Sequence, residues 1–251
     1  LAPGKKDLLC IAAGYVYKFN WQSRQWQKVS NGLPVQVGTT GFVLHPSNPD
    51  IMYVSTFGYG MFKSINGAKL WQKLDNAPKT SPGWGLDIDS MRPDTLYLGL
   101  GGSKGMYKTT DGGATWTELK EGLPDGPIGR IGLHIYRKDP RIVYALVENA
   151  EGGVFKSEDR GTSWKRINSL NPRPMYYSKI RVDPSDWRNI YILSSQFYLS
   201  DDGGKTFRSN SDMTPTYDVG VHGDHHALWV NPENGRHLIL GGDGGLYFSW
   251  D

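Results

Sequence analysis

The chain has 251 residues, of which 38% are hydrophobic and 12% aromatic, and its formal net charge at pH 7 is +3. Its basic residues are scattered along the chain, which disfavours a nucleic-acid or membrane-surface partner. The single cysteine, Cys10, excludes an internal disulfide framework, and no apolar run reaches the roughly 18 residues of a transmembrane helix.

Short β-rich runs bounded by Gly, Pro, Asp and Asn follow one another from the N-terminus, and no window has helical periodicity. The first unit offers "LLCIAA", "YVYKF" and "WQKVS". A later unit offers four runs: "RIGLHIY", "RIVYALV", "GGVFKS" and "WKRI". The last unit again offers three: "HALWV", "HLILG" and "LYFSW". The sequence therefore predicts an all-β chain of four-stranded antiparallel units, incomplete at both ends.

A glycine-rich polar turn closed by an aromatic residue recurs along the chain. Its copies are "SINGAKLW" (64–71), "TTDGGATW" (109–116), "SEDRGTSW" (157–164) and "SDDGGKTF" (200–207). The closing aromatics are 45, 48 and 43 residues apart. Proline turns before β-rich runs, such as "RPDTLY" and "DPRIVY", keep the same spacing. Four strands per repeat of this length are typical of β-propeller blades.

We therefore predict one β-propeller domain over residues 1–251. Its blade units lie approximately at 1–34, 35–78, 79–125, 126–171, 172–216 and 217–251. The first unit lacks an innermost strand and the last lacks an outermost strand. We expect these six blades to be part of a larger propeller of seven blades or more. A missing segment or a partner chain would complete it, because a bare sheet edge invites pairing.

The S/T-x-D-x-G-x-T-W pattern resembles the Asp-box, or BNR repeat. This repeat occurs in sialidases, sortilin-type receptor domains, xyloglucanases and large secreted bacterial proteins described as glycosyl hydrolases. The resemblance implies that the box is the hairpin between the third and fourth strands of a blade. We expect its carboxylates to bond to their own turns and its aromatics to pack between sheets. These structural residues are Asp111, Trp116, Asp159, Trp164, Asp202 and Phe207.

Propeller geometry places the loops that enter first strands and the loops that join second to third strands on one face, opposite the Asp-boxes. Recognition sites favour such loops, held by a rigid scaffold. Aromatic rings beside carboxylates and histidines suit a sugar, a peptide end or a metal. Of the neighbouring Tyr176 and Tyr177, one is expected to face the channel and the other to pack within its blade. We expect ligand contacts from Phe57, Tyr59, Trp84, Arg130, Tyr176, Tyr177, Asp224, His225 and His226.

The segment "HGDHH" concentrates His222, Asp224, His225 and His226 within five residues. Imidazole and carboxylate groups suit zinc or another transition metal. The other two interpretations are a structural polar network and ligand recognition. Adjacent strand residues point to opposite faces, so His225 and His226 cannot ligate one ion unless the strand is irregular there. No cofactor is expected apart from this one candidate metal ion.

Two classes of function remain open. The favoured expectation is a non-catalytic binding or assembly propeller that recognises a carbohydrate, a peptide or a protein. The alternative is a glycoside hydrolase, or a fragment of one, similar to a xyloglucanase that cleaves within a glucan. Glycosidases need two carboxyl groups, about 5–5.5 Å or 6.5–9.5 Å apart, and Glu148 and Asp243 are the candidates.

The resemblance to xyloglucanases implies acidic residues from two facing propellers, and "GDGGLY" (242–247) loosely matches their acidic loop, with Asp243 as the acid. Sialidase chemistry needs an arginine triad, and only Arg130 and Arg173 lie in suitable loops. The chain starts at Leu1 rather than Met. A removed export signal would explain this, as would a fragment boundary, so we expect an extracellular or periplasmic protein.

Overall fold

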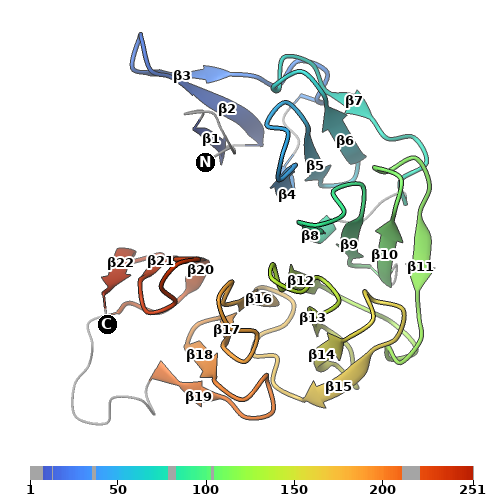
Figure 1. The fold of residues 1–251 in the computed structure, drawn as a ribbon, viewed down its shortest axis with the longest axis vertical. Coiled ribbons are helices and arrows are strands. Elements are labelled where there is room, and N and C mark those ends of the chain that lie inside the picture. The colour runs from blue at the N-terminus through green and yellow to red at the C-terminus, as the bar shows by residue number, and fades with distance from the viewer. Residues whose placement is uncertain are drawn as a thin grey trace. The chain divides into compact units, whose positions relative to one another are not determined.

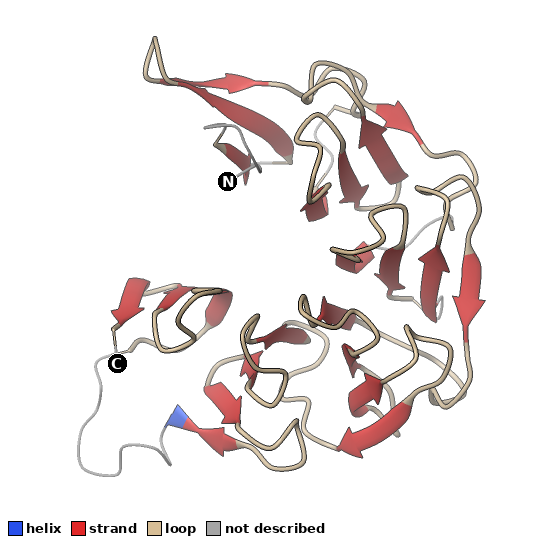
Figure 2. Ribbon diagram, in the orientation of Figure 1, coloured by secondary structure: helices blue, strands red, loops and turns tan. Residues whose placement is uncertain are grey.

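The computed structural model describes residues 8–12, 14–35, 38–78, 83–102, 105–210 and 221–250. Residues 79–82, at the start of the predicted blade unit 79–125, lie outside the described residues. Almost all of the regular structure consists of strands (Figure 2). The described chain divides into two compact units, Leu1–Glu118 and Leu119–Asp251.

The first unit contains three sheets, and each is built from strands that are consecutive in the chain (Figure 1). The first sheet has three strands: β1 (Leu9–Ala12), β2 (Tyr15–Asn20) and β3 (Gln25–Lys28). The second has four: β4 (Thr39–Leu44), β5 (Met52–Thr56), β6 (Gly60–Ser64) and β7 (Gln72–Lys73). The third also has four and ends at the boundary between the units: β8 (Gly83–Ile88), β9 (Leu96–Leu100), β10 (Gly105–Thr109) and β11 (Thr117–Leu119).

The second unit repeats this plan. Its first sheet is β12 (Ile131–Ile135), β13 (Val143–Val147), β14 (Gly153–Ser157) and β15 (Lys165–Asn168). Its second sheet is β16 (Lys179–Val182), β17 (Ile190–Leu193), β18 (Phe197–Ser200) and β19 (Arg208–Ser209). Its third sheet has three strands: β20 (His225–Val230), β21 (Leu238–Gly242) and β22 (Gly245–Ser249). The strands pair antiparallel with their sequence neighbours, as β12 to β15 show.

The sequence prediction of an all-β chain is confirmed, including the three-stranded first and last sheets. The second strands of the full sheets are buried on both faces, which explains why they are continuous apolar runs such as Val143–Val147. In the second unit one apolar core lies between neighbouring sheets and includes Leu146, Ile180 and Ile192. A second core there joins Leu193 to Leu228. Each fully buried aliphatic side chain contributes roughly 1.5–3 kcal/mol.

Each Asp-box carboxylate bonds within its own turn. Asp202 Oδ1 accepts hydrogen bonds from the Ser200 hydroxyl at 2.8 Å and the Thr206 amide at 3.0 Å, and Oδ2 accepts from the Thr206 hydroxyl at 2.7 Å. Burial opposes ionisation, but these hydrogen bonds outweigh it and lower the pKa of Asp202 to about 2. Asp111 and Asp159 are bonded in the same way.

The second residue after each Asp-box aspartate is a glycine with positive φ, a backbone conformation that costs energy in other residues. Gly204 has φ of 89° and Gly113 has φ of 94°. The closing aromatic then anchors the turn: Trp164 is 5% exposed, and its indole N–H donates to the Gly161 carbonyl at 3.2 Å. Trp116 and Phe207 pack against the apolar cores of their units. These residues hold turns in place and present no free carboxylate.

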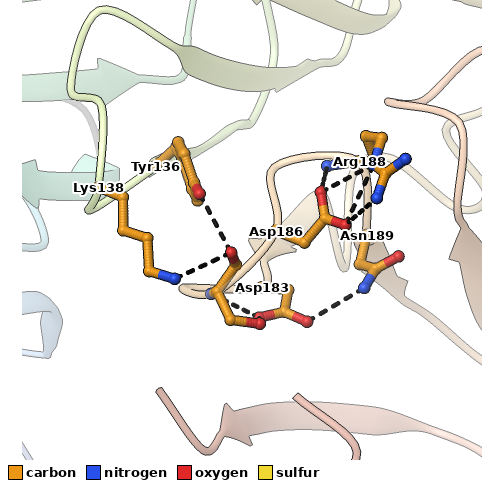
Figure 3. A network of polar contacts seen from close by, with 7 residues as sticks. Tyr136, Lys138, Asp183, Asp186, Arg188 and Asn189 are labelled. Carbon is orange, nitrogen blue, oxygen red and sulfur yellow. Dashed lines mark hydrogen bonds and ion pairs between the residues drawn. The ribbon is translucent and has the colours of Figure 1, made fainter. Parts of the chain in front are cut away.

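In the second unit a proline turn is bonded to an Asp-box. The N–H of Gly203, in the Asp-box, donates to the carbonyl of Arg188, in the turn that follows Pro184, at 3.0 Å. We call this end of the sheets the turn end, and the opposite end the loop end. At the turn end, Tyr136 Oη and Lys138 Nζ both donate to the Ser185 carbonyl, at 3.2 Å each (Figure 3). Asp183 holds the same turn through the Ser185 amide. The two bonds from Tyr136 and Lys138 to Ser185 connect the sheet β12–β15 to the sheet β16–β19.

Candidate functional site

The loop before β16 positions two tyrosines at the loop end of the second unit. The Tyr176 and Tyr177 amides both donate to the Arg173 carbonyl, at 3.0 and 3.2 Å. Arg173 and Ser178 have positive φ, 47° and 42°, conformations that cost energy in non-glycine residues. Tyr176 is 52% exposed and Tyr177 only 1%. The two rings therefore divide their roles, one turned to solvent and one packed inside.

Tyr177 reaches the next sheet through Asp224. Its hydroxyl donates a short hydrogen bond to Asp224 Oδ1, and Arg173 Nη1 lies 3.9 Å from the same oxygen. Burial, followed by the bond to Asp224, raises the pKa of Tyr177 to about 12. Tyr177 is therefore a protonated donor at neutral pH and holds its aspartate in place. Asp224 itself has φ of 65°, a strained conformation just before β20.

His226 lies at an irregularity in β20. The pairing register with β21 shifts between His225 and Ala227, as in a β-bulge, which re-aims the intervening side chain. The His226 ring stacks on Tyr177, with ring centroids 5.6 Å apart. Its Nε2 lies 3.0 Å from Asp243 Oδ1, and the Asp243 side chain is 59% exposed. Asp243 lies in the turn between β21 and β22, and its backbone N–H donates to the Asp224 carbonyl at 3.2 Å.

These five residues, Tyr176, Tyr177, Asp224, His226 and Asp243, form what we call the tyrosine–aspartate cluster. Four of its members are linked by contacts across two sheets, and Tyr176 packs edge-on against Tyr177 with centroids 4.9 Å apart. The cluster presents one exposed aromatic ring and one exposed carboxylate.

Two partly buried basic residues, Lys179 and Arg130, contact the cluster. Lys179 Nζ lies 3.1 Å from His226 Nδ1. Burial, with repulsion from Arg130 and Arg181, lowers the pKa of Lys179 to about 8. Arg130 Nη1 donates to the Tyr177 carbonyl at 3.3 Å. Lys179 is not among the residues predicted from the sequence, although basic and apolar residues alternate in "KIRV" (179–182). In β16 this alternation places Lys179 and Arg181 on one face.

The structure gives the two candidate carboxylates different partners. Glu148 Oε2 accepts the Arg130 amide at 2.7 Å, next to the backbone pair that Gly129 N–H makes with the Glu148 carbonyl at 2.8 Å. A Cβ on residue 129 would lie 2.2 Å from Glu148 Cδ, so only glycine leaves room for this arrangement. Glu148 is therefore engaged by backbone, whereas Asp243 belongs to the exposed cluster.

The other two histidines of "HGDHH" have separate environments. His225 is fully buried, its ring lies 6.2 Å from that of Phe197, and its ring nitrogens have no hydrogen-bond partner among the described residues. Burial lowers its pKa. The His222 amide donates to Tyr247 Oη at 2.9 Å. Across the described ranges, no group of three or more His, Cys, Asp or Glu is placed to hold a metal, and the metal site at "HGDHH" stays a prediction.

In the first unit, Phe57 and Trp84 form an aromatic pair with ring centroids 6.4 Å apart. The expectation that Trp84 lies in a loop is wrong: it lies in β8, where the register with β9 shifts between Gly83 and Gly85. Trp84 thus has the same position in its sheet as His226 has in the last one. Phe57 and Tyr59 are more than half exposed.

No family model matches the chain. The chain is 24% identical over 257 residues to a probable oligoxyloglucan-reducing end-specific xyloglucanase of Neosartorya fischeri, covering 82% of this chain and 30% of the relative. It is also 24% identical to a xyloglucanase of a Paenibacillus species, covering 84% of this chain and 23% of the relative. The chain thus spans less than a third of the length of these curated relatives.

The crystal structure of an ancestral GH74 enzyme superposes on 98% of this chain and 35% of its own, with a TM-score of 0.71 and 17% identity. The chain has the β-propeller fold. The predicted resemblance to propellers of the glycosyl hydrolases is confirmed. Among the described residues, no helix has the length and apolar character needed to cross a bilayer.

Proposed function

We propose that this propeller is part of a glycoside hydrolase that acts on a polysaccharide of the xyloglucan type. The similarity to xyloglucanases over more than four fifths of the chain supports this substrate class. The observation that carries the proposal is the tyrosine–aspartate cluster, where an exposed aromatic ring and an exposed carboxylate belong to one connected group.

In this proposal Tyr176 provides a sugar-stacking surface and Asp243 is one of the two reacting carboxylates. The apolar face of a sugar ring packs on aromatic rings, and a carboxylate beside it is the group that glycoside cleavage requires. Asp243 Oδ2 has no hydrogen-bond partner among the described residues, so this oxygen is available to a ligand. Asp224 is held by Tyr177 and Arg173 and serves the arrangement of the cluster.

The other candidate carboxylate, Glu148, already accepts a backbone amide with one oxygen at the end of β13. We therefore propose that the second carboxylate comes from outside this chain, on a propeller that faces the cluster. A polysaccharide does not cross a membrane unaided, so the proposal includes action outside the cytoplasm. The predicted ligand contacts at Phe57, Tyr59 and Trp84 remain part of the proposal as further sugar contacts in the first unit.

The test is hydrolysis of xyloglucan by the native protein that contains this chain, measured as released reducing ends. Asp243→Asn is expected to lower kcat by about 100-fold or more, the size of effect typical of an acid–base group. Tyr176→Ala is expected to weaken binding of xyloglucan oligosaccharides about tenfold in calorimetric titrations, because it removes a stacking ring. Asp201→Asn is the matched control: Asp201 is an exposed carboxylate with one ion-pair partner, Arg208, at the turn end.

Unchanged hydrolysis in Asp243→Asn contradicts the catalytic assignment. The second candidate function, carbohydrate binding without cleavage, is favoured by the engagement of Glu148 with backbone. It predicts that the wild-type protein binds the oligosaccharides, that Tyr176→Ala weakens this binding, and that no reducing ends appear.

A further inference from the structure

Lys179, His226 and Asp243 form a line of polar contacts that starts in the interior and ends at the surface. Lys179 Nζ lies 3.1 Å from one ring nitrogen of His226, Nδ1. The other ring nitrogen, Nε2, lies 3.0 Å from Asp243 Oδ1. Lys179 is partly buried, the His226 side chain is 32% exposed and that of Asp243 is 59% exposed.

The first contact fixes the proton on the histidine. A lysine ammonium has three N–H donors and no acceptor, so His226 Nδ1 must accept. A neutral imidazole has one N–H, which must then be on Nε2. A doubly protonated ring is disfavoured because its Nδ1–H would point at the ammonium. The nitrogen that faces Asp243 is therefore a donor, and Asp243 Oδ1 is the acceptor.

The remaining contacts hold the histidine in this orientation. The β-bulge between His225 and Ala227 takes His226 out of the regular alternation of β20. One face of its ring stacks on Tyr177, which is itself buried and bonded to Asp224. Lys179 is fixed by its place in β16, opposite Leu193 of β17. Each part of the line is thus supported by a different strand or loop.

We propose that Lys179 and His226 are positioning residues for Asp243: Lys179 selects the Nε2–H tautomer of His226, and His226 presents that N–H to one oxygen of the carboxylate. This inference rests on the proposed function and adds a division of labour to it. With Oδ1 held as an acceptor, Asp243 turns Oδ2 to the ligand in the unprotonated form. Of the two reacting carboxyl groups, Asp243 is then the unprotonated one, and the second carboxyl group donates the proton.

The direct test is the tautomeric state of His226, read from imidazole ¹⁵N chemical shifts of histidine-labelled protein, with His226→Gln to assign the signals. The wild-type protein is expected to show His226 protonated at Nε2 alone at pH 7. Because the Asp243 carboxylate also requires a donor at Nε2, the effect of Lys179 is measured in an Asp243→Ala background. The Nε2–H tautomer is expected to persist in Asp243→Ala, and a mixture of both tautomers is expected in Lys179→Met/Asp243→Ala. Lys179→Arg is the conservative control: its guanidinium also donates only, so the Nε2–H tautomer is expected to persist.

The single variants of Lys179 give the catalytic readout. Lys179→Met is expected to lower kcat about 10- to 100-fold with KM little changed, because a misplaced reacting group costs rate more than binding. Lys179→Arg is expected to recover most of that loss. A purely structural lysine predicts lower stability in Lys179→Met with kcat of the folded protein unaltered.

The two readouts separate this inference from the proposed function. A wild-type His226 that is protonated at Nδ1, or a tautomer that is the same in Asp243→Ala and in Lys179→Met/Asp243→Ala, overturns the inference whatever the activity. An unchanged kcat in Lys179→Met overturns the positioning role. The expected tautomer in a protein that cleaves no glycan counts against the proposed function and leaves the hydrogen-bonded line intact.

Discussion

The two ends of the sheets in the second unit use aspartate in opposite ways. At the turn end, all partners of Asp159 belong to its own turn: Oδ1 accepts from Ser157 and Ser163, and Oδ2 accepts from the Ser163 hydroxyl at 2.6 Å. At the loop end, Asp243 has one side-chain partner, His226, on a different strand. Local bonds that satisfy every oxygen make an aspartate structural. A single distant partner and an unused oxygen make it available for chemistry.

The comparison predicts that stability resides at the turn end. Trp164→Ala removes a buried anchor of an Asp-box and is expected to lower the free energy of unfolding by about 3–5 kcal/mol, measured by urea denaturation. Trp26→Ala is the matched control, because Trp26 is 44% exposed and its loss is expected to cost under about 1 kcal/mol. Equal losses in the two variants break the comparison.

The two kinds of aspartate can be compared in one experiment. Asp202→Ala removes the acceptor of the part-buried Ser200 hydroxyl and of the exposed donors of Lys205 and Thr206, and is expected to cost about 1–2 kcal/mol of stability. Asp243→Ala removes one partly exposed pair and is expected to cost at most about 0.5 kcal/mol. The measurement is the denaturation midpoint of each variant. A larger loss for Asp243→Ala contradicts the assignment of roles.

Acid is expected to loosen the loop end before the turn end. His225 is buried and its pKa is lowered below 6.5, so the folded state binds fewer protons than the open state as pH falls through 6.5. Protection of the His225 amide, which donates to Ser194, is expected to fall by up to about tenfold per pH unit below that value. For Asp159, burial opposes ionisation but hydrogen bonds from Ser163 outweigh it and lower the pKa.

The measurement is amide hydrogen exchange at pH 7 and pH 5, corrected for intrinsic rates. The Gly161 amide, which donates to the Ser157 hydroxyl, is expected to keep its protection because Asp159 stays ionised over this range. His225→Leu removes the titrating ring and is expected to abolish the pH dependence at the loop end. A parallel loss of protection at both ends indicates global loosening and contradicts the prediction.

The fold was largely predictable because its signals are local. The Asp-box repeats place a polar turn and an aromatic at fixed spacing, and the strands between them are continuous apolar runs. The number of β-rich runs also predicted only three strands in the first and last units, and the structure has three-stranded sheets there.

The candidate site was predicted only in part, because its contacts are not local. Residue types near Tyr176 and Asp224 indicated a polar, aromatic surface. The pairing of His226 with Asp243 depends on a β-bulge that the residue types in this strand do not predict. The proposed role of Lys179 depends on its contact with His226, which lies 47 positions further along the chain. Trp84 was placed in a loop because it lies in the Gly- and Pro-containing stretch "KTSPGWG" (79–85), whereas the structure begins β8 at Gly83.

We expect the loop end of the second unit, rather than its turn end, to bind the sugar. Backbone amide shifts of the labelled protein, recorded while a xyloglucan oligosaccharide is added, test it most directly. The account predicts saturable shifts at Tyr176, His226 and Asp243, with Asp159 and Asp202 unmoved. Shifts centred on the Asp-box turns, or no shifts at either end at millimolar oligosaccharide, contradict it.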